Sequence, residues 1–324
     1  MKTAFVTGVA GFVGSAVAAR LLADGYKVVG VDSLNDYYDP ALKKQRVALL
    51  KKHAKAKHFT FRKLDLVDRA ALVRVLKSVK PGVVIHLAAQ ASVRYGLVNP
   101  VSYLERNLIG HFNVLEAMRL CGIGRLLYAS SSSVYGANEK VPFAESDDVS
   151  RPVSLYAATK RADELITEAW CHQFGLKATG LRFFTVYGPW GRPDMSPMIF
   201  ARAIVEGKKI PLFNKGDLWR DFTFVDDIVE AVVRLMGAPE QGHSIYNLGN
   251  QNPVRMDEFV RAMEKALGRK AKVDLLPWPS TEVYKTYADT RALKKAVGWA
   301  PGTSLEDGLR VFAEWFVPWH AKNK

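Results

Sequence analysis

The chain has 324 residues, a formal net charge of +14 and two cysteines, Cys121 and Cys171. This length suits two lobes, or one large α/β domain with an appended lobe. Two cysteines give neither a disulfide framework nor a metal-binding pattern, and no apolar run is long enough to cross a bilayer.

The positive charge is concentrated in residues 43–46 and 51–58. A basic surface can bind nucleic acid or an anionic membrane, or it can steer a small polyanionic substrate. Val47, Leu49 and Leu50 interrupt the basic residues, which is typical of a helix with a basic, solvated face. No signature of a nucleic-acid-binding module is present. We therefore expect neither nucleic acid nor a membrane as a partner. The first residues enter a strand-like run without a signal-peptide region, which predicts a cytoplasmic location.

Short β-branched runs alternate with helical stretches over the first half of the chain, which predicts a Rossmann-type, doubly wound parallel α/β sheet. The expected strands are Ala4–Thr7, Lys27–Asp32, Phe59–Lys63, Val83–Ala88, Arg125–Ser130 and Lys177–Phe183. The expected helices are Phe12–Ala23, Pro40–Lys52, Arg69–Ser78, Pro100–Leu120 and Leu155–Phe174.

The pattern changes after Phe184, where Pro and Gly become frequent and short strands and helices mix. This change predicts a smaller C-terminal α/β lobe. We place one domain at residues 1–187 and the lobe mainly at residues 188–324. A helix at Val225–Met236 is expected to pack back onto the first domain.

A glycine-rich turn follows the first strand. Gly8, Gly11 and Gly14 recur every three residues, and a helix opens at Phe12 and Val13. Glycines permit the tight turn and the close approach of a pyrophosphate, while the helix N-terminus offers free N–H groups. This strand–turn–helix context predicts that the five residues bind a dinucleotide.

Asp32 ends the second strand, 18 residues beyond Gly14. A carboxylate there can accept hydrogen bonds from both ribose hydroxyls and would repel a 2′-phosphate, which predicts NAD rather than NADP. Asn35 follows in the same loop and is a further candidate. Asp65 and Leu66 end the third strand, where an adenine edge would lie, and Asp65 can equally cap the next helix.

The remaining cofactor candidates lie at the ends of later strands and in the expected helix at residues 100–120. Small residues after the fourth strand would let the backbone approach the cofactor. Asn107 either fixes the backbone near the site or is an incidental polar residue. These candidates are Leu87, Ala88, Ala89, Gln90, Asn107, Phe183 and Val186.

Tyr156 and Lys160 are four residues apart on an expected helix, so their side chains share one face. A phenol ordinarily ionises at about pH 10, and a neighbouring ammonium favours the phenolate. Such a pair can act as a base near neutral pH. Together with the glycine turn and the serine run Ser130–Ser133, the pair indicates redox chemistry on an alcohol.

These motifs together resemble the extended short-chain dehydrogenase/reductase family, and within it the nucleotide-sugar 4-epimerases, over essentially the whole chain. The closest resemblance is to UDP-glucuronate 4-epimerases. It rests on the segments Val31–Asp39, Ala91–Gly96, Arg182–Met195 and Arg220–Asp227. The segment Trp278–Asp289 departs from the family, because relatives often carry an arginine there that this chain lacks.

The resemblance implies that Tyr156 takes the proton of the sugar 4-hydroxyl while NAD⁺ takes the C4 hydride. The hydride then returns to the other face of a 4-keto sugar. Lys160 favours the phenolate and holds the nicotinamide ribose. Ser131 hydrogen-bonds the reacting oxygen, and Ser132 and Ser133 face the sugar. Four serines can also be a polar turn, but such a turn does not need the Val-Tyr-Gly that follows.

The implied substrate is a UDP-sugar with a 6-carboxylate, bound mainly by the C-terminal lobe. Thr185 leaves room for the carboxylate, and Arg192 offers it two parallel donors. Arg192 can otherwise be a surface arginine or a contact to the diphosphate. The diphosphate is expected to rely on Arg220 and Arg94, and the uridine ribose on Glu282.

The leading hypothesis is an NAD-dependent 4-epimerase of UDP-glucuronate and UDP-galacturonate that works as a homodimer, paired through the helices at residues 100–120 and 155–174. The alternatives on the same fold are a UDP-glucose/UDP-galactose-type 4-epimerase and a UDP-glucuronate decarboxylase. A 4,6-dehydratase is disfavoured, because Ser132 and Ser133 occupy the positions of its acidic pair. The hypothesis from a different class is a non-catalytic NAD-binding scaffold or RNA-binding relative.

Overall fold

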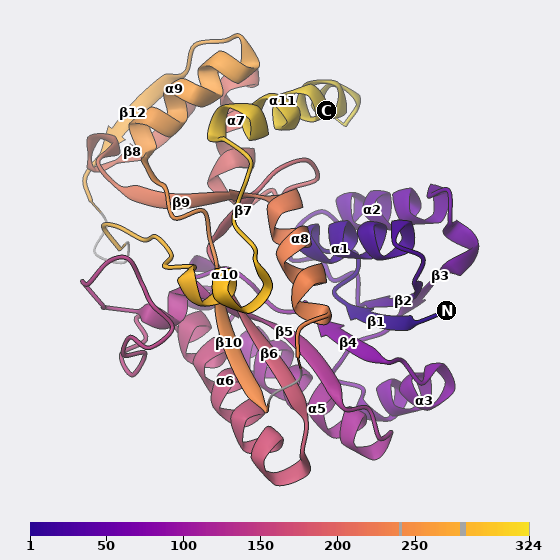
Figure 1. Cartoon of the computed structure of the whole chain (residues 1–324). Helices are drawn as coiled ribbons and strands as arrows, with labels where there is room; N and C mark the ends of the chain where they lie inside the picture. Colours follow the sequence, from indigo (N-terminus) through magenta and orange to yellow (C-terminus); the bar gives the residue numbers. More distant parts are fainter. Residues whose placement is uncertain (240–241, 279–282, 324) are drawn as a thin grey trace. The chain divides into compact units, whose positions relative to one another are not determined.

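The computed structural model describes residues 1–239, 242–278 and 283–323, which form two compact units (Figure 1). The first unit contains Met1–Asn138, Asp148–Phe183 and Val229–Tyr246. The second unit contains Glu139–Asp147, Phe184–Ile228 and Asn247–Lys324. Each unit therefore draws on segments that are far apart in the sequence.

A seven-stranded sheet forms the centre of the first unit, in the order β3-β2-β1-β4-β5-β6-β10. The strands from β1 to β6 pair in parallel. The strand order reverses between β1 and β4, which is the switch point of a doubly wound sheet, so the predicted Rossmann-type fold is confirmed. The strands are β1 (Thr3–Thr7), β2 (Lys27–Asp32), β3 (Phe59–Lys63), β4 (Val83–His86), β5 (Arg125–Ser131), β6 (Lys177–Phe183) and β10 (His243–Leu248).

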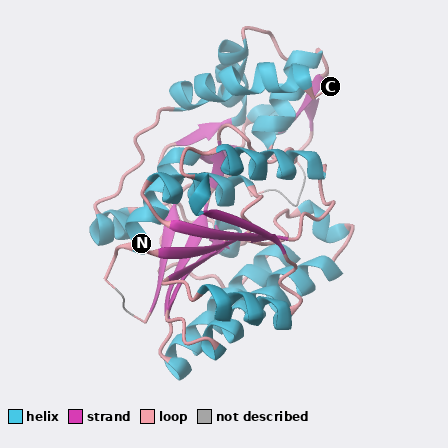
Figure 2. Ribbon diagram, turned by 90° about the vertical axis from the view of Figure 1, so that its right-hand side faces the viewer, coloured by secondary structure: helices cyan, strands magenta, loops and turns pink. Residues whose placement is uncertain are grey.

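Helices cover both faces of this sheet, with α1, α2 and α8 on one face and α3, α5 and α6 on the other (Figures 1 and 2). Polar side chains cap the N-termini of three of these helices: Asp39 caps α2, Asp68 caps α3 and Ser154 caps α6. Gly175 ends α6 in the left-handed conformation. The helical elements are α1 (Phe12–Ala23), α2 (Pro40–Lys52), η1 (Ala56–His58), α3 (Arg69–Val79), η2 (Arg94–Leu97), α4 (Val101–Tyr103), η3 (Leu104–Ile109), α5 (Gly110–Leu120), η4 (Ser132–Tyr135), α6 (Leu155–Phe174) and α8 (Val225–Met236).

The apolar core of the first unit lies between the sheet and the layer of α3, α5 and α6. Phe5, Val84 and Leu126 on the central strands are fully buried, together with Leu76 of α3 and Leu115 of α5. Strands covered on both faces by helices are expected to be apolar along their whole length. This packing holds the carboxyl ends of β1, β2, β4 and β5 on a rigid platform.

Two predicted elements differ from the structure. The fourth strand ends at His86 rather than Ala88, because Ala88 N–H turns to the Thr7 hydroxyl at 3.2 Å instead of continuing the ladder. The predicted helix Pro100–Leu120 is interrupted by η3, which is a π-helical turn. Asn107 lies in this turn and is buried, and its side chain binds backbone outside the helix. A π turn at such a residue is a recurring feature of functional sites.

The second unit is a smaller α/β unit with two small sheets, ordered β11-β9-β7 and β12-β8. Asp221 on β9 is fully buried and accepts N–H groups of Asn250 (2.6 Å), Gln251 (3.1 Å) and Ala288 (2.9 Å), so one carboxylate fixes two loops. The elements are β7 (Thr185–Tyr187), α7 (Ser196–Glu206), β8 (Lys209–Phe213), η5 (Asn214–Gly216), β9 (Trp219–Phe224), β11 (Pro253–Arg255), α9 (Met256–Leu267), β12 (Lys272–Leu276), α10 (Arg291–Val297) and α11 (Leu305–Lys322). Across the described residues of both units, no helix is both long and apolar enough to cross a membrane.

Candidate active site

The glycine turn lies between β1 and α1, at the switch point of the sheet. Gly8 has φ +68°, and a Cβ added there would lie 2.7 Å from the backbone nitrogen of Ala88. A Cβ at Gly14 would lie 2.1 Å from the Gly8 carbonyl oxygen. Gly11 is the N-cap of α1, and no side chain in the described part of the chain caps it. The turn therefore leaves the N–H groups of the first helical residues, Phe12 and Val13 included, available to an anion such as a phosphate.

Asp32 ties the end of β2 to the glycine turn. Its carboxylate accepts the N–H of Ala10 at 3.1 Å and the N–H of Leu34 at 2.8 Å. Burial raises the pKa of Asp32, while the bond from Leu34 and the charge of Lys43 act in the opposite direction. The carboxylate is thus positioned beside the turn, as expected for a ribose contact.

Two basic residues of α2 also lie in this region, and the sequence pattern did not predict their position there. Lys43 and Arg46 are buried instead of forming part of a solvated basic face. The Lys43 ammonium donates to the Asn35 carbonyl at 2.7 Å, and Arg46 donates to the carbonyl of Ala10 at 3.0 Å and to the hydroxyl of Tyr38 at 2.7 Å. The signal was present, because both residues share a helical face with the buried apolar residues of α2.

Asp65 follows β3, but it does not cap a helix. The N-cap of α3 is Asp68, whose carboxylate accepts the N–H of Ala71 at 2.9 Å, so the capping interpretation of Asp65 is wrong. Asp65 instead accepts the N–H of Val67 at 3.2 Å and forms an ion pair with Arg106 of η3. The neighbouring Leu66 points into the apolar core.

Asn107 joins three segments of the first unit. Its amide oxygen accepts Gln90 N–H at 2.8 Å, and its amide nitrogen donates to Gln90 O at 3.2 Å and to the Thr159 hydroxyl at 2.9 Å. The segment Leu87–Ala89, half-buried beyond the end of β4, is thereby held next to α6. Of the two interpretations of Asn107, the structure supports the one in which it fixes the backbone.

Tyr156 and Lys160 share the inner face at the N-terminal end of α6. Tyr156 is half-buried, and its ring meets the edge of Tyr103 with 6.3 Å between centroids. Lys160 is only 2% exposed, and its ammonium donates to Ala129 O at 3.0 Å and to Asp163 Oδ2 at 3.0 Å. The bond to Ala129 ties α6 to β5 two residues before Ser131.

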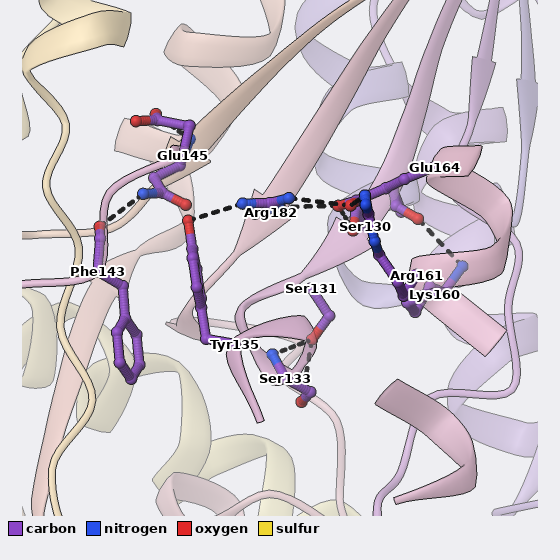
Figure 3. A network of polar contacts seen from close by, with 12 residues as sticks. Ser130, Ser131, Ser133, Tyr135, Phe143, Glu145, Lys160, Arg161, Glu164 and Arg182 are labelled. Carbon is purple, nitrogen blue, oxygen red and sulfur yellow. Dashed lines mark hydrogen bonds and ion pairs between the residues drawn. The ribbon is translucent and has the colours of Figure 1, made fainter. Parts of the chain in front are cut away.

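The serines at the end of β5 and the start of η4 have different surroundings, and Figure 3 shows Ser130, Ser131 and Ser133. The Ser130 hydroxyl donates to the carboxylate of Glu164 at 2.6 Å, and Glu164 is also paired with Arg182 at 2.8 Å. Ser131 instead caps η4, where its oxygen accepts the N–H of Ser133 at 3.2 Å. Ser130 is therefore committed to a buried ion-pair network, whereas Ser131 belongs to the turn that follows the strand, as does the half-buried Ser132.

The candidates for substrate binding are divided between the units. Arg94 lies exposed on η2 of the first unit, whereas Thr185 is half-buried on β7 of the second. The Arg192 guanidinium donates to the Asp194 carboxylate at 3.1 Å, and Arg220 donates to the carbonyl of Trp219 at 2.8 Å.

Three further candidates complete the set. Phe183 and Val186, expected near the cofactor, are half-buried at the end of β6 and on β7. Glu282 lies outside the described residues.

Comparison with known proteins places the chain in a family. Residues 4–249 match the NAD dependent epimerase/dehydratase family. The chain belongs to this family. A member described as a probable UDP-glucuronate 4-epimerase, from Rhizobium meliloti (strain 1021), is 42% identical over 96% of each chain.

Two solved structures of epimerases share the fold of this chain over nearly its full length. UDP-glucuronic acid 4-epimerase from Bacillus cereus, in complex with UDP-glucuronic acid and NAD, gives a TM-score of 0.90 at 29% identity, with 98% of this chain and 99% of that chain covered. UDP-glucose 4-epimerase from Thermotoga maritima, with UDP-glucose, gives 0.88 at 29% identity, with 99% and 100% covered. The resemblance to nucleotide-sugar 4-epimerases is therefore confirmed.

Proposed function

We propose that this chain catalyses the NAD-dependent 4-epimerisation of UDP-glucuronate to UDP-galacturonate. The observation that carries the proposal is the bond from Lys160 to Ala129, because it brings the face of α6 with Tyr156 next to Ser131 at the end of β5. Relatives over nearly the whole chain that are named UDP-glucuronate 4-epimerases support the choice of substrate.

The residues of the first unit fit a bound dinucleotide. The glycine turn cannot accept a side chain at Gly8 or Gly14, and the uncapped α1 N-terminus suits the diphosphate. Asp32 would hold the adenosine ribose and disfavour a 2′-phosphate, so the dinucleotide is NAD. When bound, NAD accepts a hydride from C4 of the sugar and later returns it to the opposite face.

Tyr156 supplies the acid–base chemistry in this proposal. Its phenolate accepts the proton of the sugar 4-hydroxyl, and the same oxygen returns a proton after the 4-keto sugar has turned in the site. The Lys160 ammonium favours the phenolate and donates to the nicotinamide ribose. Ser131 donates a hydrogen bond to the reacting oxygen, with Ser132 and Ser133 towards the sugar.

The acidic sugar and its nucleotide are assigned to the remaining candidates. Thr185 and Arg192 hold the 6-carboxylate, Arg220 and Arg94 hold the diphosphate, and Glu282 holds the uridine ribose. The neutral-sugar epimerase is the second candidate, since the Thermotoga maritima neighbour was solved with UDP-glucose.

The direct test is proton NMR of the nucleotide sugar after incubation of the purified protein with UDP-glucuronate. We expect UDP-galacturonate to accumulate to equilibrium. A UDP-pentose would indicate decarboxylation instead, and turnover of UDP-glucose alone would indicate the neutral-sugar epimerase. Unchanged sugars in every case would favour a non-catalytic scaffold.

The matched control is Tyr156→Phe, which keeps the ring and removes the hydroxyl. A proton-transfer group contributes about 10²–10⁴-fold to rate, so turnover should fall by at least that factor while nucleotide binding survives. Near-normal epimerisation by this variant would exclude Tyr156 as the base.

We further propose that the enzyme works as a homodimer in the cytoplasm. Large apolar side chains remain exposed on the neighbouring helical elements η3, α5 and α6, among them Ile109, Phe112, Leu165 and Phe174. Exposed apolar surface concentrated on adjacent helices is typical of a protein–protein interface.

A further inference from the structure

A stripe of polar residues runs along the inner face of α6, where apolar residues would be expected. Tyr156, Lys160, Asp163 and Thr167 are spaced by four, three and four residues, so they share one helical face. The last three are at most 2% exposed. Tyr156 and Lys160 have roles in the proposed reaction, but Asp163 has none.

Asp163 is the partner of the Lys160 ammonium. Its side chain is 0% exposed, and Oδ2 accepts a hydrogen bond from Lys160 Nζ at 3.0 Å. Its second oxygen, Oδ1, has no hydrogen-bond partner among the described residues. A carboxylate held without full hydrogen bonding in the interior depends on the ammonium beside it, and the ammonium depends on the carboxylate in the same way.

The other titratable groups around this pair are already committed to one charge state. On β4 and α5, burial lowers the pKa of His86 and lowers that of His111 to about 3, so both imidazoles are neutral near pH 7. On β5, burial raises the pKa of Tyr128 and keeps it protonated. On α6 itself, the negative charge of Glu164 is balanced by its ion pair with Arg182 of β6.

Two further charged or titratable residues lie near the pair, Arg161 and His243, and both already have partners. Arg161 of α6 also reaches Glu164, and His243 of β10 binds both Tyr128 and Glu168. None of these contacts includes Lys160, so Asp163 alone supplies it with a directly bound negative charge within the described part of the first unit.

We infer that Asp163 is a positioning residue whose carboxylate balances the charge of Lys160 and thereby sets the pH at which Tyr156 ionises. This inference rests on the proposed function for its catalytic meaning, but the ionisation of Tyr156 can be measured without any substrate. When Asp163 is charged, its negative charge offsets the positive charge of the Lys160 ammonium, so the ammonium stabilises the Tyr156 phenolate less. With Asp163 neutral, the full charge of Lys160 acts on Tyr156.

The size of the effect follows from the helix. Tyr156 and Asp163 are seven residues apart, which is about 10 Å at 1.5 Å per residue. Two unit charges at that distance, at an effective dielectric constant of about 20, interact enough to move an ionisation midpoint by about one pH unit. Burial raises the pKa of Asp163 to about 6, so the carboxylate is charged at neutral pH and loses its charge as the pH falls through about 6.

The experiment compares the protein with Asp163→Asn, which keeps the size of the side chain and an oxygen acceptor for Lys160. Tyrosinate absorbance is titrated in the ultraviolet, and the same titration of Tyr156→Phe is subtracted, so the difference belongs to Tyr156. We expect the midpoint for Tyr156 to fall by about one pH unit in Asp163→Asn. The acid limb of kcat/KM for the proposed reaction should move by the same amount.

Thr167→Val is the matched control, because it lies one turn further on the same face and changes no charge. It should leave the midpoint unchanged. In a Lys160→Met background, Asp163 has no ammonium to balance, so Asp163→Asn should shift the midpoint less there than it does in the protein with Lys160.

An unchanged or raised midpoint in Asp163→Asn, with only a lower melting temperature, would overturn the inference and leave Asp163 a structural residue. If Asp163→Asn does not fold, Asp163→Ser takes its place with the same expected shift, and failure of both variants to fold also overturns the inference. A shifted midpoint in a protein that turns over no UDP-sugar would support the role of Asp163 while refuting the proposed function.

Discussion

At the scale of single residues, Asp32 is the residue that we propose selects the dinucleotide at the glycine turn. Its carboxylate is fixed by two backbone N–H groups, and the buried cations Lys43 and Arg46 lie close enough to act on its charge. Removing that negative charge would leave two cations beside the adenosine ribose. A 2′-phosphate would then meet attraction instead of repulsion.

We therefore expect Asp32→Ser to lose affinity for NAD and gain affinity for NADP. A charge-assisted hydrogen bond contributes about 1.5–3 kcal/mol, which corresponds to roughly 10–100-fold in affinity. Binding of both dinucleotides to the purified variant measures the change, with the exposed neighbour Asp36→Asn as the control. Release of mainly NADP from the denatured unaltered protein would contradict the premise.

Arg192 is the residue on which the preference for an acidic sugar should depend. Its guanidinium is held by Asp194, so a substrate carboxylate must bind the same group in competition with an internal one. Arg192→Ala should weaken UDP-glucuronate binding by about tenfold or more, and leave UDP-glucose binding about as before. Calorimetric titration with the two nucleotide sugars measures this difference.

Asp194→Asn is the companion variant, because it removes the competing carboxylate and should strengthen binding of the acidic sugar. Equal loss of both sugars in Arg192→Ala would assign the arginine to the diphosphate or to the fold. The preference for the acid would then rest on Thr185 and the serine run.

The sequence predicted the place of candidate residues in the fold correctly where one local motif carries them. The glycine turn, Asp32 and the Tyr156–Lys160 spacing are all read within a few residues of a strand or helix end. Arg106 was missed because its partner, Asp65, is 41 residues away in the chain. Asp163 was missed for a different reason, since a buried acid on a helix can be assigned only when the packing of that helix is known.

At the scale of elements, the π turn η3 links the cofactor side of the first unit to α6. Asn107→Leu would leave the Gln90 N–H and carbonyl without this partner, whereas the Thr159 hydroxyl would keep its bond to the Tyr156 carbonyl at 2.9 Å. Each buried polar group left unsatisfied costs about 1–3 kcal/mol, so the loss of both Gln90 bonds should lower the free energy of unfolding by about 2–6 kcal/mol. Urea unfolding followed by circular dichroism measures this loss.

The same substitution should also slow turnover, because the half-buried segment at residues 87–89 and α6 lose their common support. Asn99→Ala is the control, since Asn99 makes its hydrogen bond to Ser102 at the surface. A variant Asn107→Leu with normal stability and normal turnover would show that the π turn does not depend on this side chain.

Most elements of the first unit were predictable, because apolar periodicity and polar caps agree there. The predicted helices α2, α3 and α6, which start at polar caps, match the structure to within one residue at each end, and α6 also ends at Gly175. The region at residues 100–120 was not predictable in detail. Its apolar pattern is helical throughout, and only the distant backbone of Gln90 explains why one turn is wider.

At the scale of the whole molecule, the exposed apolar side chains of η3, α5 and α6 should determine the oligomeric state. Ile109 is 47% exposed and Leu165 is 54% exposed, and their elements are neighbours in the first unit. Replacing either by glutamate puts a charge into an apolar interface, which should convert a dimer into monomers.

Sedimentation velocity of Ile109→Glu and Leu165→Glu tests this expectation. Leu49→Glu is the control, because Leu49 is 46% exposed but lies on α2 among lysines. Dimers that persist in both variants would place the interface elsewhere, and a monomeric unaltered protein would remove the proposal.

The strand order of the first unit has a consequence for biosynthesis. β6 ends at Phe183, and its outer neighbour β10 begins only at His243, 60 residues later. The Arg125 guanidinium on β5 donates to the carbonyl of Leu235 at 2.8 Å, so this bond also cannot form until residue 235 has been synthesised.

At about 5–20 residues per second, a ribosome needs roughly 3–12 s to synthesise the residues between β6 and β10. During that time the nascent chain exposes an open parallel strand, which is a site for mispairing with other chains. The sheet of the first unit is therefore completed only after the chain has passed through β7, α7, β8 and β9 of the second unit.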